Sequence, residues 1–283
     1  MDLEYSYREL LNLCNSSKLG NVSKGISNLF ENNLAKKWTP ELNSEWVCRH
    51  YLATKMILNA TVLLKALEFS TEKNMRLANP YFEYYAVLSL ARAIVYTLPT
   101  EYWNNGEIIT ISHSKAIKLA FSWLGRFNSN IAKNLEETTL KLKAQRELIA
   151  YRIPSSGDLN LSDDHNLEEI LTILAEVAQF NSELLYKALE KYADKKNFII
   201  CDDSHAREIA DIEIEGFNFF DNEDAYRLGY LKRKMPSPYP LHFTMTEGMT
   251  EDFFSAWDSD SDSDDGQFSV GSPSSWQIIF DIP

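Results

Sequence analysis

The sequence predicts a mainly α-helical fold, in which a helical bundle is followed by a small acidic C-terminal extension containing a few strands. Glycine and proline are scarce, at 10 and 9 of 283 residues, which disfavours a turn-rich β sandwich. Between residues 39 and 196, apolar side chains recur at helical spacing in successive segments. After residue 196 the apolar pattern alternates in two places, as it does in strands.

Charge divides the chain in the same way. Residues 200–283 hold 18 acidic and 5 basic residues, so they carry the whole formal net charge of −13. We therefore expect three parts: an N-terminal helical arm over 1–38, a helical bundle over 39–196 and an acidic extension over 197–283. An acidic surface repels nucleic acid, which excludes a broad electrostatic footprint for DNA but leaves room for a local basic cleft in the neutral part.

The N-terminal arm is expected to contain a short helix over Leu3–Leu13 and then a loop from Asn15 to Lys24. The bundle begins at Thr39 and Pro40, because threonine caps a first helical turn and proline at that position needs no partner for an N–H. This first bundle helix is expected to run to about Phe69, with an apolar face formed by Trp46, Leu52, Met56, Ile57, Leu63, Leu64 and Leu67.

The second bundle helix is expected to start with Asn-Pro at residues 79–80 and to end before Pro99. It is apolar almost all round, which is typical of a helix at the centre of a bundle. The segment could be mistaken for a membrane span, but Glu83 and Arg92 would be expensive in lipid. We therefore expect a buried helix and no membrane association.

The remaining bundle helices are expected to begin near Ser112, to span about 127–152 and to run from about Asn166 to Ala193. The middle one of these carries a stripe at steps of three and four residues: Ile131, Leu135, Thr138, Leu142, Arg146 and Ile149. Arg146 is thus a charged residue inside an apolar stripe, and this position requires an explanation.

In the extension, the alternating segments 211–219 and 276–282 predict strands. Between them, repulsion among the acids of Asp258–Asp265 should keep that run solvated. Three interpretations of the run stay open. The first is a solvated linker, the second is a segment that occupies a basic cleft or binds a basic partner, and the third is a site of serine modification.

The three cysteines, Cys14, Cys48 and Cys201, are far apart and odd in number, which argues against a disulfide framework and for a reducing compartment. The first residues lack the pattern of a secretory signal. We therefore expect a cytoplasmic protein. Because no cysteines and histidines are paired at zinc-ligand spacing, we expect no metal and no cofactor.

Three segments of the bundle carry a resemblance to a known family. Residues 84–93 read YYAVLSLARA, residues 112–117 read SHSKAI and residues 146–152 read RELIAYR. In their order and spacing they resemble the central helix, the start of the following helix and the Arg…His segment of HEPN domains (higher eukaryotes and prokaryotes nucleotide-binding). Residues 166–189 are similar to that family's closing helix. The resemblance covers about residues 40–195 and implies an antiparallel helical bundle of the HEPN type, so we expect a homodimer.

The resemblance also implies an activity. In active HEPN proteins two copies of the Arg…His motif face each other and cleave RNA without a metal, in toxin–antitoxin, abortive-infection and other defence systems. Arginine stabilises charge developing on a phosphate, and histidine moves a proton near neutral pH. The catalytic residues implied here are Arg146 and Tyr151, with Tyr151 at the position of the family's histidine. Because the unperturbed pKa of tyrosine is near ~10, Tyr151 would need a large downward shift to act as a base.

Two functions are consistent with these observations. The first is a HEPN-like protein of defence or stress type that binds RNA or a protein partner, with RNA cleavage left open by the tyrosine at position 151. The alternative is a non-catalytic protein-interaction module whose acidic C-terminal extension engages a basic partner. Simpler interpretations stand beside them: Arg146 pairs with a carboxylate at the edge of the interior, Tyr151 packs between helices, and His113 caps or packs a helix start.

Overall fold

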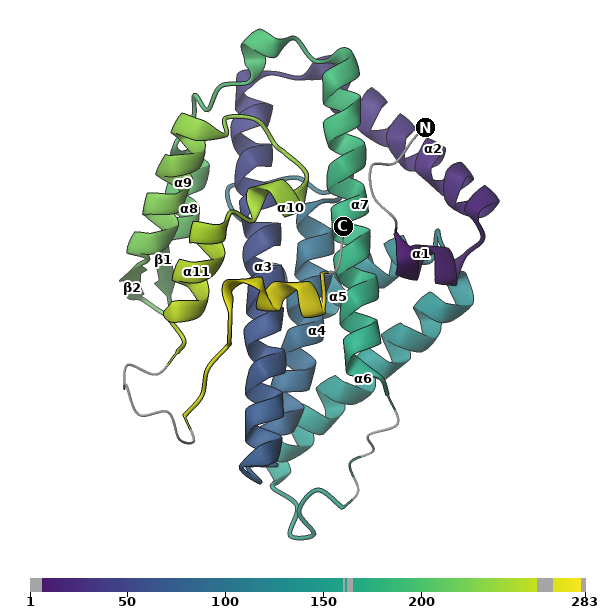
Figure 1. Cartoon of the computed structure of the whole chain (residues 1–283), viewed down its shortest axis with the longest axis vertical. Helices are drawn as coiled ribbons and strands as arrows, with labels where there is room; N and C mark the ends of the chain where they lie inside the picture. The colour runs from purple at the N-terminus through teal and green to yellow at the C-terminus, as the bar shows by residue number, and fades with distance from the viewer. Residues whose placement is uncertain (1–6, 160, 162–164, 259–266, 281–283) are drawn as a thin grey trace.

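Five long helices form the centre of the molecule in a computed structural model that describes residues 7–159, 161, 165–258 and 267–280. They are α3 (Pro40–Glu72), α4 (Asn79–Tyr96), α5 (His113–Leu124), α6 (Ser129–Arg152) and α7 (Leu167–Tyr192). In Figure 1, α3 runs down the molecule and α4 returns beside it, while α7 runs upward from the lower end. The mainly α-helical fold predicted from the sequence is therefore confirmed, and these five helices begin within about three residues of the predicted starts.

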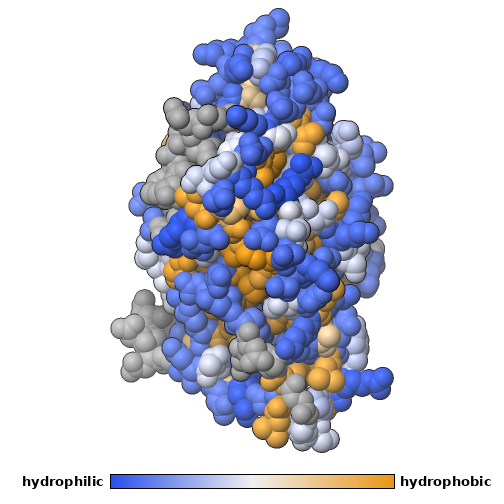
Figure 2. All heavy atoms as spheres, turned by 90° about the vertical axis from the view of Figure 1, so that its right-hand side faces the viewer, coloured by the Kyte–Doolittle hydropathy of each residue, from blue (hydrophilic) through white to orange (hydrophobic). Residues whose placement is uncertain are grey.

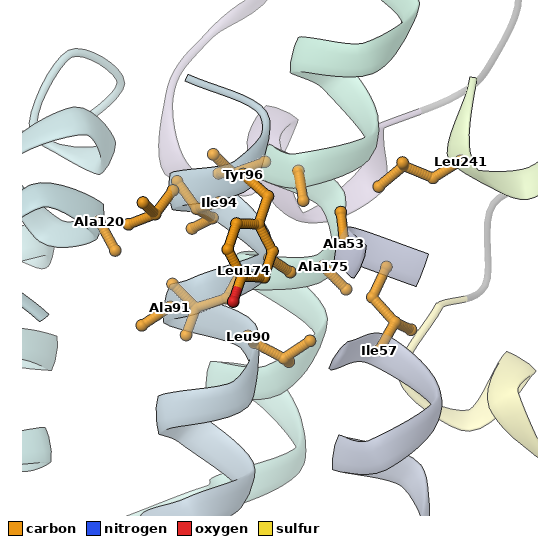
Figure 3. Packing of buried hydrophobic residues seen from close by; sticks show 14 of the residues in the cluster. Ala53, Ile57, Leu90, Ala91, Ile94, Tyr96, Ala120, Leu174, Ala175 and Leu241 are labelled. Atoms are coloured by element: carbon orange, nitrogen blue, oxygen red, sulfur yellow. The ribbon is translucent and has the colours of Figure 1, made fainter. Parts of the chain in front are cut away.

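Helix α4 lies in the middle of this group, because it packs against α3, α5, α6 and α7. Figure 3 shows Leu90, Ala91 and Ile94 of α4 near side chains of α3 and α7. Most of α4 from Ala86 onward is buried, as its apolar sequence predicts. The burial of apolar area on all sides of α4 is a major stabilising contribution to the fold, at about 25 cal/mol for each Å² removed from water.

Capping explains where the helices start. The hydroxyl of Thr39 accepts a hydrogen bond from the backbone N–H of Leu42 at 3.3 Å, and the side chain of Asn166 accepts one from Glu169 at 3.3 Å. These contacts satisfy first-turn N–H groups that have no partner within the helix. The helix starts expected from the sequence near these two positions are confirmed.

The N-terminal arm contains α1 (Arg8–Leu13), α2 (Ser16–Asn33) and the 3₁₀ turn η1 (Ala35–Lys37), which all pack against α7. The loop expected from Asn15 to Lys24 is wrong, because those residues open α2. Asn15 caps α2 by accepting from the N–H of Lys18, and buried positions recur at Leu19, Ser23, Ile26 and Phe30, one face of a helix. Residues 3–6 of the expected first helix lie outside the described residues.

Two buried glutamates of α7 fix the arm in place. Glu176 accepts hydrogen bonds from the backbone N–H groups of Glu9 at 3.1 Å and Leu10 at 2.9 Å, at the start of α1. The hydroxyl of Tyr7 donates to the carboxylate of Glu183, which also pairs with Lys187 at 2.5 Å. The arm is thus bound to α7 through polar contacts that are themselves buried.

The acidic extension is mostly helical and lies along α3 (Figure 1). The 3₁₀ turn η2 (Lys195–Asn197) leads into the extension. Its helices are α8 (Ser204–Ala210), α9 (Asn222–Lys234), α10 (Leu241–Thr244) and α11 (Glu247–Ser255). Strands β1 (Asp211–Ile214) and β2 (Phe217–Phe220) form an antiparallel hairpin in which Ile214 pairs with Phe217. Its two-residue turn places Glu215 and Gly216 at positive φ, 53° and 82°, as tight hairpins require. The strand structure expected within 211–219 is therefore confirmed, but a turn divides the segment into two strands that pair with each other.

The second strand expected in the extension is wrong. Residues Pro273–Ile278 form the 3₁₀ helix η3, and Ile279 and Phe280 after it are buried. Proline at the first position of η3 favours a helical start. The apolar side chains of this segment reach the core from a helical turn and the residues that follow it, and not from alternate positions of a strand. Residues 281–283 and most of the Asp258–Asp265 run lie outside the described residues.

Hydrogen bonds tie the extension to the long helices. The side chain of Asn43 on α3 donates to the carbonyl oxygens of Ile199 and Pro236, at 2.9 and 2.6 Å. The ring Nδ1 of His50 lies 2.7 Å from the carbonyl oxygen of Tyr239. Leu241 is buried and points toward the long helices in Figure 3. The extension thus shares its core with the rest of the chain.

Figure 2 shows the face that lies at the right of Figure 1, where apolar atoms appear between polar ones near the middle of the surface. Leu11 of α1 and Leu140 of α6 are among the large apolar side chains that remain exposed. Among the described residues, none of the helices combines the length and the apolar character needed to cross a bilayer.

Candidate anion-binding site

Arg146 lies on the face of α6 that turns toward α4. Its side chain is only 13% exposed, and its nearest carboxylate is Glu147, 3.7 Å from Nη2 and itself 43% exposed. The buried Nε of Arg146 has no hydrogen-bond partner among the described residues. A loose contact with a solvated neighbour neutralises the guanidinium only in part. Arg146 therefore keeps most of its capacity to bind an anion.

Tyr84 and Tyr85, near the start of α4, form a shared aromatic platform for Arg146 and for His113 of α5. The guanidinium carbon of Arg146 lies 5.4 and 5.9 Å from the centroids of the two tyrosine rings. The imidazole of His113 lies 5.8 and 5.9 Å from the same rings. In addition, the hydroxyl of Tyr84 is 3.0 Å from Nδ1 of His113. The fold thus brings a cation and an imidazole from different helices to one place.

Further positive charge surrounds this platform. Arg92 follows Tyr85 by two helical turns, so both lie on one face of α4. Its Nη2 donates a long hydrogen bond, 3.4 Å, to the carbonyl oxygen of Ile111, while its buried Nε has no partner among the described residues. Lys143 lies one turn before Arg146 on α6, 3.8 Å from Glu147. We call Arg92, His113, Lys143 and Arg146 the cationic cluster.

The environment of His113 favours its neutral form. Partial burial lowers the pKa of His113 below its ordinary value, and the charges of Arg92, Arg146 and Lys143 lower it further. The burial of Tyr84 raises the pKa of its hydroxyl to about 12. Near neutral pH the two partners of this hydrogen bond are therefore both uncharged.

The start of α5 adds to the positive potential. Ser112 caps the helix by accepting from the N–H of Lys115 at 3.4 Å, and His113 is the first residue of α5. Backbone N–H groups in the first turn of a helix, together with the helix dipole, favour nearby negative charge. Two guanidinium groups with unpaired N–H donors, an imidazole and this helix start together suit an anion of phosphate type.

Of the two predicted catalytic residues, only Arg146 belongs to this cluster. The side chain of Tyr151 is 75% exposed, and in the described part of the chain no hydrogen bond, ion pair or ring contact joins it to Arg146. Five residues along a helix correspond to a rotation of about 140°, so the two side chains leave α6 in different directions. Whether either residue takes part in catalysis stays a prediction.

His113 is the residue that sequence reasoning treated only as a cap or packing group. It does begin a helix, and it also contacts both tyrosines of the platform. The sequence does contain one usable signal, because Tyr85 and Arg92 are seven residues apart and must share a helix face. Which side of α5 and α6 meets that face depends on tertiary packing, which a single sequence does not reveal.

The described residues contain no group of three or more histidine, cysteine, aspartate or glutamate side chains that could hold a metal ion. Comparisons with models of protein families, with curated proteins and with solved structures found no match to this chain.

Proposed function

We propose that this chain is a HEPN-like helical protein that binds RNA by holding a backbone phosphate against the cationic cluster. The observation that carries the proposal concerns Arg146: its guanidinium is mostly buried, and in the described part of the chain its Nε lacks a hydrogen-bond partner and its carboxylate neighbour lies 3.7 Å away. Burying a charge without a strong carboxylate partner costs free energy, and such a cost is typical of a group that binds a ligand. A phosphate oxygen would supply the guanidinium with a partner of opposite charge.

The resemblance to HEPN domains supports RNA as the source of the phosphate. The three segments that carry the resemblance, 84–93, 112–117 and 146–152, each supply a residue to the cationic cluster or to its tyrosine platform. Segments far apart in the sequence thus converge on one site. The cluster is small within a chain of net charge −13, so we expect few phosphate contacts and modest affinity.

The proposal extends to the biological setting that the resemblance implies. We propose a homodimer in the cytoplasm that acts in a defence or stress response of the toxin–antitoxin or abortive-infection type. The proposal leaves open whether the protein also cleaves RNA without a metal, and one assay answers this question. Incubating the protein with RNA in the presence of a chelator, and comparing wild type with Arg146→Ala, tells whether binding is accompanied by cleavage at this site.

The direct test is RNA binding by fluorescence anisotropy with a labelled short oligouridine. Arg146→Ala should weaken binding about tenfold or more, because a hydrogen bond to a charged group contributes about 1.5–3 kcal/mol. Arg126→Ala is the matched control: Arg126 is an exposed arginine stacked 4.3 Å from the ring of Trp123, outside the cluster. Equal losses in both variants, or no loss in Arg146→Ala, would exclude this site.

A second candidate function has its own structural support, in the cavity of about 370 Å³ between α3, α9 and α11. Its lining includes Glu223 beside Phe253 and Trp257, and Trp257 is 56% exposed. The other lining carboxylates already face basic side chains of the same cavity, because Lys55 pairs with Asp221 and Asp224 and Arg227 pairs with Asp252. Glu223 and the aromatic side chains suit an arginine or lysine side chain of a basic protein partner. Binding of an oligoarginine peptide that is lost in Trp257→Ala and in Glu223→Gln would support this alternative. Unchanged binding in both variants would exclude it.

A further inference from the structure

The proposed function uses the charge of the cluster but does not use the hydrogen bond between Tyr84 and His113. We propose that the site binds its phosphate together with a proton, which His113 takes up from solvent, so that affinity for the anion is controlled by pH. This inference rests on the proposed function, because it concerns the same anion at the same cluster. It adds a regulatory property that charge alone would not produce.

The charges that face His113 come from two neighbouring helices and from its own. Helix α4 presents Arg92 beside the neutral rings of Tyr84 and Tyr85, and α6 presents Lys143 and Arg146. The helix start of α5 adds a partial positive charge. Among the described residues, Glu147 is a carboxylate that contacts this cluster, at 3.7 Å from Arg146 and 3.8 Å from Lys143. These positive charges therefore disfavour protonation of His113 when no anion is bound.

A bound phosphate reverses this repulsion. Its negative charge offsets the charges of Arg92 and Arg146 and attracts a proton to the imidazole, because a nearby opposite charge favours the charged form of a titrating group. His113 then becomes a further N–H donor next to the anion. Reciprocity requires that a ligand which promotes proton binding is itself bound more tightly when the proton is present.

The hydrogen bond from Tyr84 allows His113 to change charge without moving. A hydroxyl both donates and accepts, so the contact of 3.0 Å between the Tyr84 hydroxyl and Nδ1 of His113 can persist in either state. When His113 is neutral, the Tyr84 hydroxyl donates to Nδ1. When His113 is protonated, the N–H on Nδ1 donates to the hydroxyl. The complete burial of Tyr84 keeps this partner in place, so Tyr84 is a positioning residue.

The experiment measures the titration of His113 by NMR, in the full-length protein, with and without sulfate. Sulfate is the probe because its charge stays constant across the range of about pH 5–8 in which histidine titrates. We expect sulfate to raise the pKa of His113 in the wild type and not in Arg146→Ala. In the same range, affinity for sulfate and for a short oligouridine should rise as pH falls, by at most about tenfold per pH unit for one coupled proton.

Three variants separate a proton-linked role from a structural one. His113→Asn should bind both anions with an affinity that no longer depends on pH, while His205→Asn, which changes a histidine of α8 in the extension, should behave as wild type. Tyr84→Phe keeps the ring under Arg146 and removes the hydroxyl, so it should retain anion binding and alter the pKa of His113. Circular dichroism of each variant establishes that it is folded.

The outcomes distinguish this inference from the function on which it rests. Oligouridine binding that depends on Arg146 but not on pH, or a pH dependence that survives in His113→Asn, overturns the proton uptake and leaves RNA binding standing. Binding that does not depend on Arg146 at all removes both. A sulfate-induced rise in the pKa of His113 that is lost in Arg146→Ala supports both.

Discussion

The Nε of Arg49 on α3 donates a hydrogen bond of 2.8 Å to the carbonyl oxygen of Tyr96, where α4 ends. The same guanidinium donates to the carbonyl oxygens of Leu98 at 2.7 Å and Glu101 at 2.8 Å. Its side chain is 1% exposed. Arg49 thus satisfies carbonyl groups at the end of α4 and in the chain after it that would otherwise be buried without partners.

We predict that Arg49→Ala lowers the free energy of unfolding by about 3–5 kcal/mol, because it leaves several buried acceptors unpaired. Arg49→Lys should also be strongly destabilising, since one ammonium cannot reproduce the planar fork that reaches three carbonyl groups. Urea denaturation provides the measurement. A loss below about 1 kcal/mol in Arg49→Ala, the range expected of a surface arginine, would show that these contacts contribute little.

A second prediction concerns the attachment of the extension. Asp224 of α9 is buried and accepts hydrogen bonds from the hydroxyl of Tyr51 at 2.6 Å and from Nζ of Lys55 at 2.5 Å, both on α3. Asp224→Asn replaces one acceptor oxygen by an amide facing a donor, so we expect a loss of about 2–4 kcal/mol.

Hydrogen exchange locates this effect. Amides of α9 should exchange faster in Asp224→Asn while those of α4 keep their protection, because local opening involves the least stable contacts first. The control is Glu223→Gln, which changes the exposed residue next to Asp224. It should leave the exchange rates of both α9 and α4 amides unchanged. Uniformly faster exchange across α4 and α9 would mean that the extension does not open separately from the long helices.

A third prediction tests the helical state of the segment that sequence reasoning assigned to a loop. Gly20 lies inside α2, and a methyl group added there would meet nothing within 4 Å. Gly20→Ala should therefore stabilise the protein by about 0.5–1 kcal/mol, the difference between the two residues in a helix interior. Gly157, at a φ of +65°, is the contrasting position, and Gly157→Ala should destabilise. Thermal unfolding measures both, and a lower Tm for Gly20→Ala would contradict a helix at this position.

A fourth prediction concerns pH. Burial, with the nearby charge of Arg49, lowers the pKa of His50 to about 4 in the folded protein, and burial lowers that of His242 to about 4. The Nδ1 of His50 lies 2.7 Å from the carbonyl oxygen of Tyr239, and its buried Nε2 has no partner among the described residues. A second proton would thus create a buried N–H without an acceptor.

The sign follows from comparing the two states. Below about pH 6.5 the unfolded chain binds protons at these histidines while the folded chain does not, so stability falls as pH decreases from about 6.5 to about 4. The contribution of His50 alone is up to about 3 kcal/mol over that range. Denaturant unfolding at a series of pH values should show a shallower decline in His50→Gln than in wild type. Parallel curves would contradict the assignment.

The long helices could be predicted from the sequence because their signals are local. Thr39 and Pro40 mark the start of α3, and the continuous apolar sequence between residues 80 and 98 marks α4 as central. Local signals gave the wrong secondary structure where burial against other helices determined it. A loop was expected over Asn15–Lys24, although these residues cap and open α2 and apolar side chains on one face of this helix are buried against α7.

The candidate site divides in the same way. Arg146 was singled out because a charge interrupted an apolar stripe, a feature of one helix. His113 could not be paired with it, because their meeting depends on how α5 and α6 both pack on the tyrosines of α4. Tyr151 was chosen by its position after Arg146 within the motif, while the helical rotation between them separates their side chains.

The salt dependence of RNA binding tests the central claim most directly, because each phosphate contact releases counterions. The affinity of oligouridine for wild type, Arg146→Ala and Arg126→Ala should be measured over a series of salt concentrations. The account predicts that the slope of log affinity against log salt becomes shallower by about 0.7 in Arg146→Ala and is unchanged in Arg126→Ala. The same slope and affinity in all three proteins would show that Arg146 does not hold a phosphate.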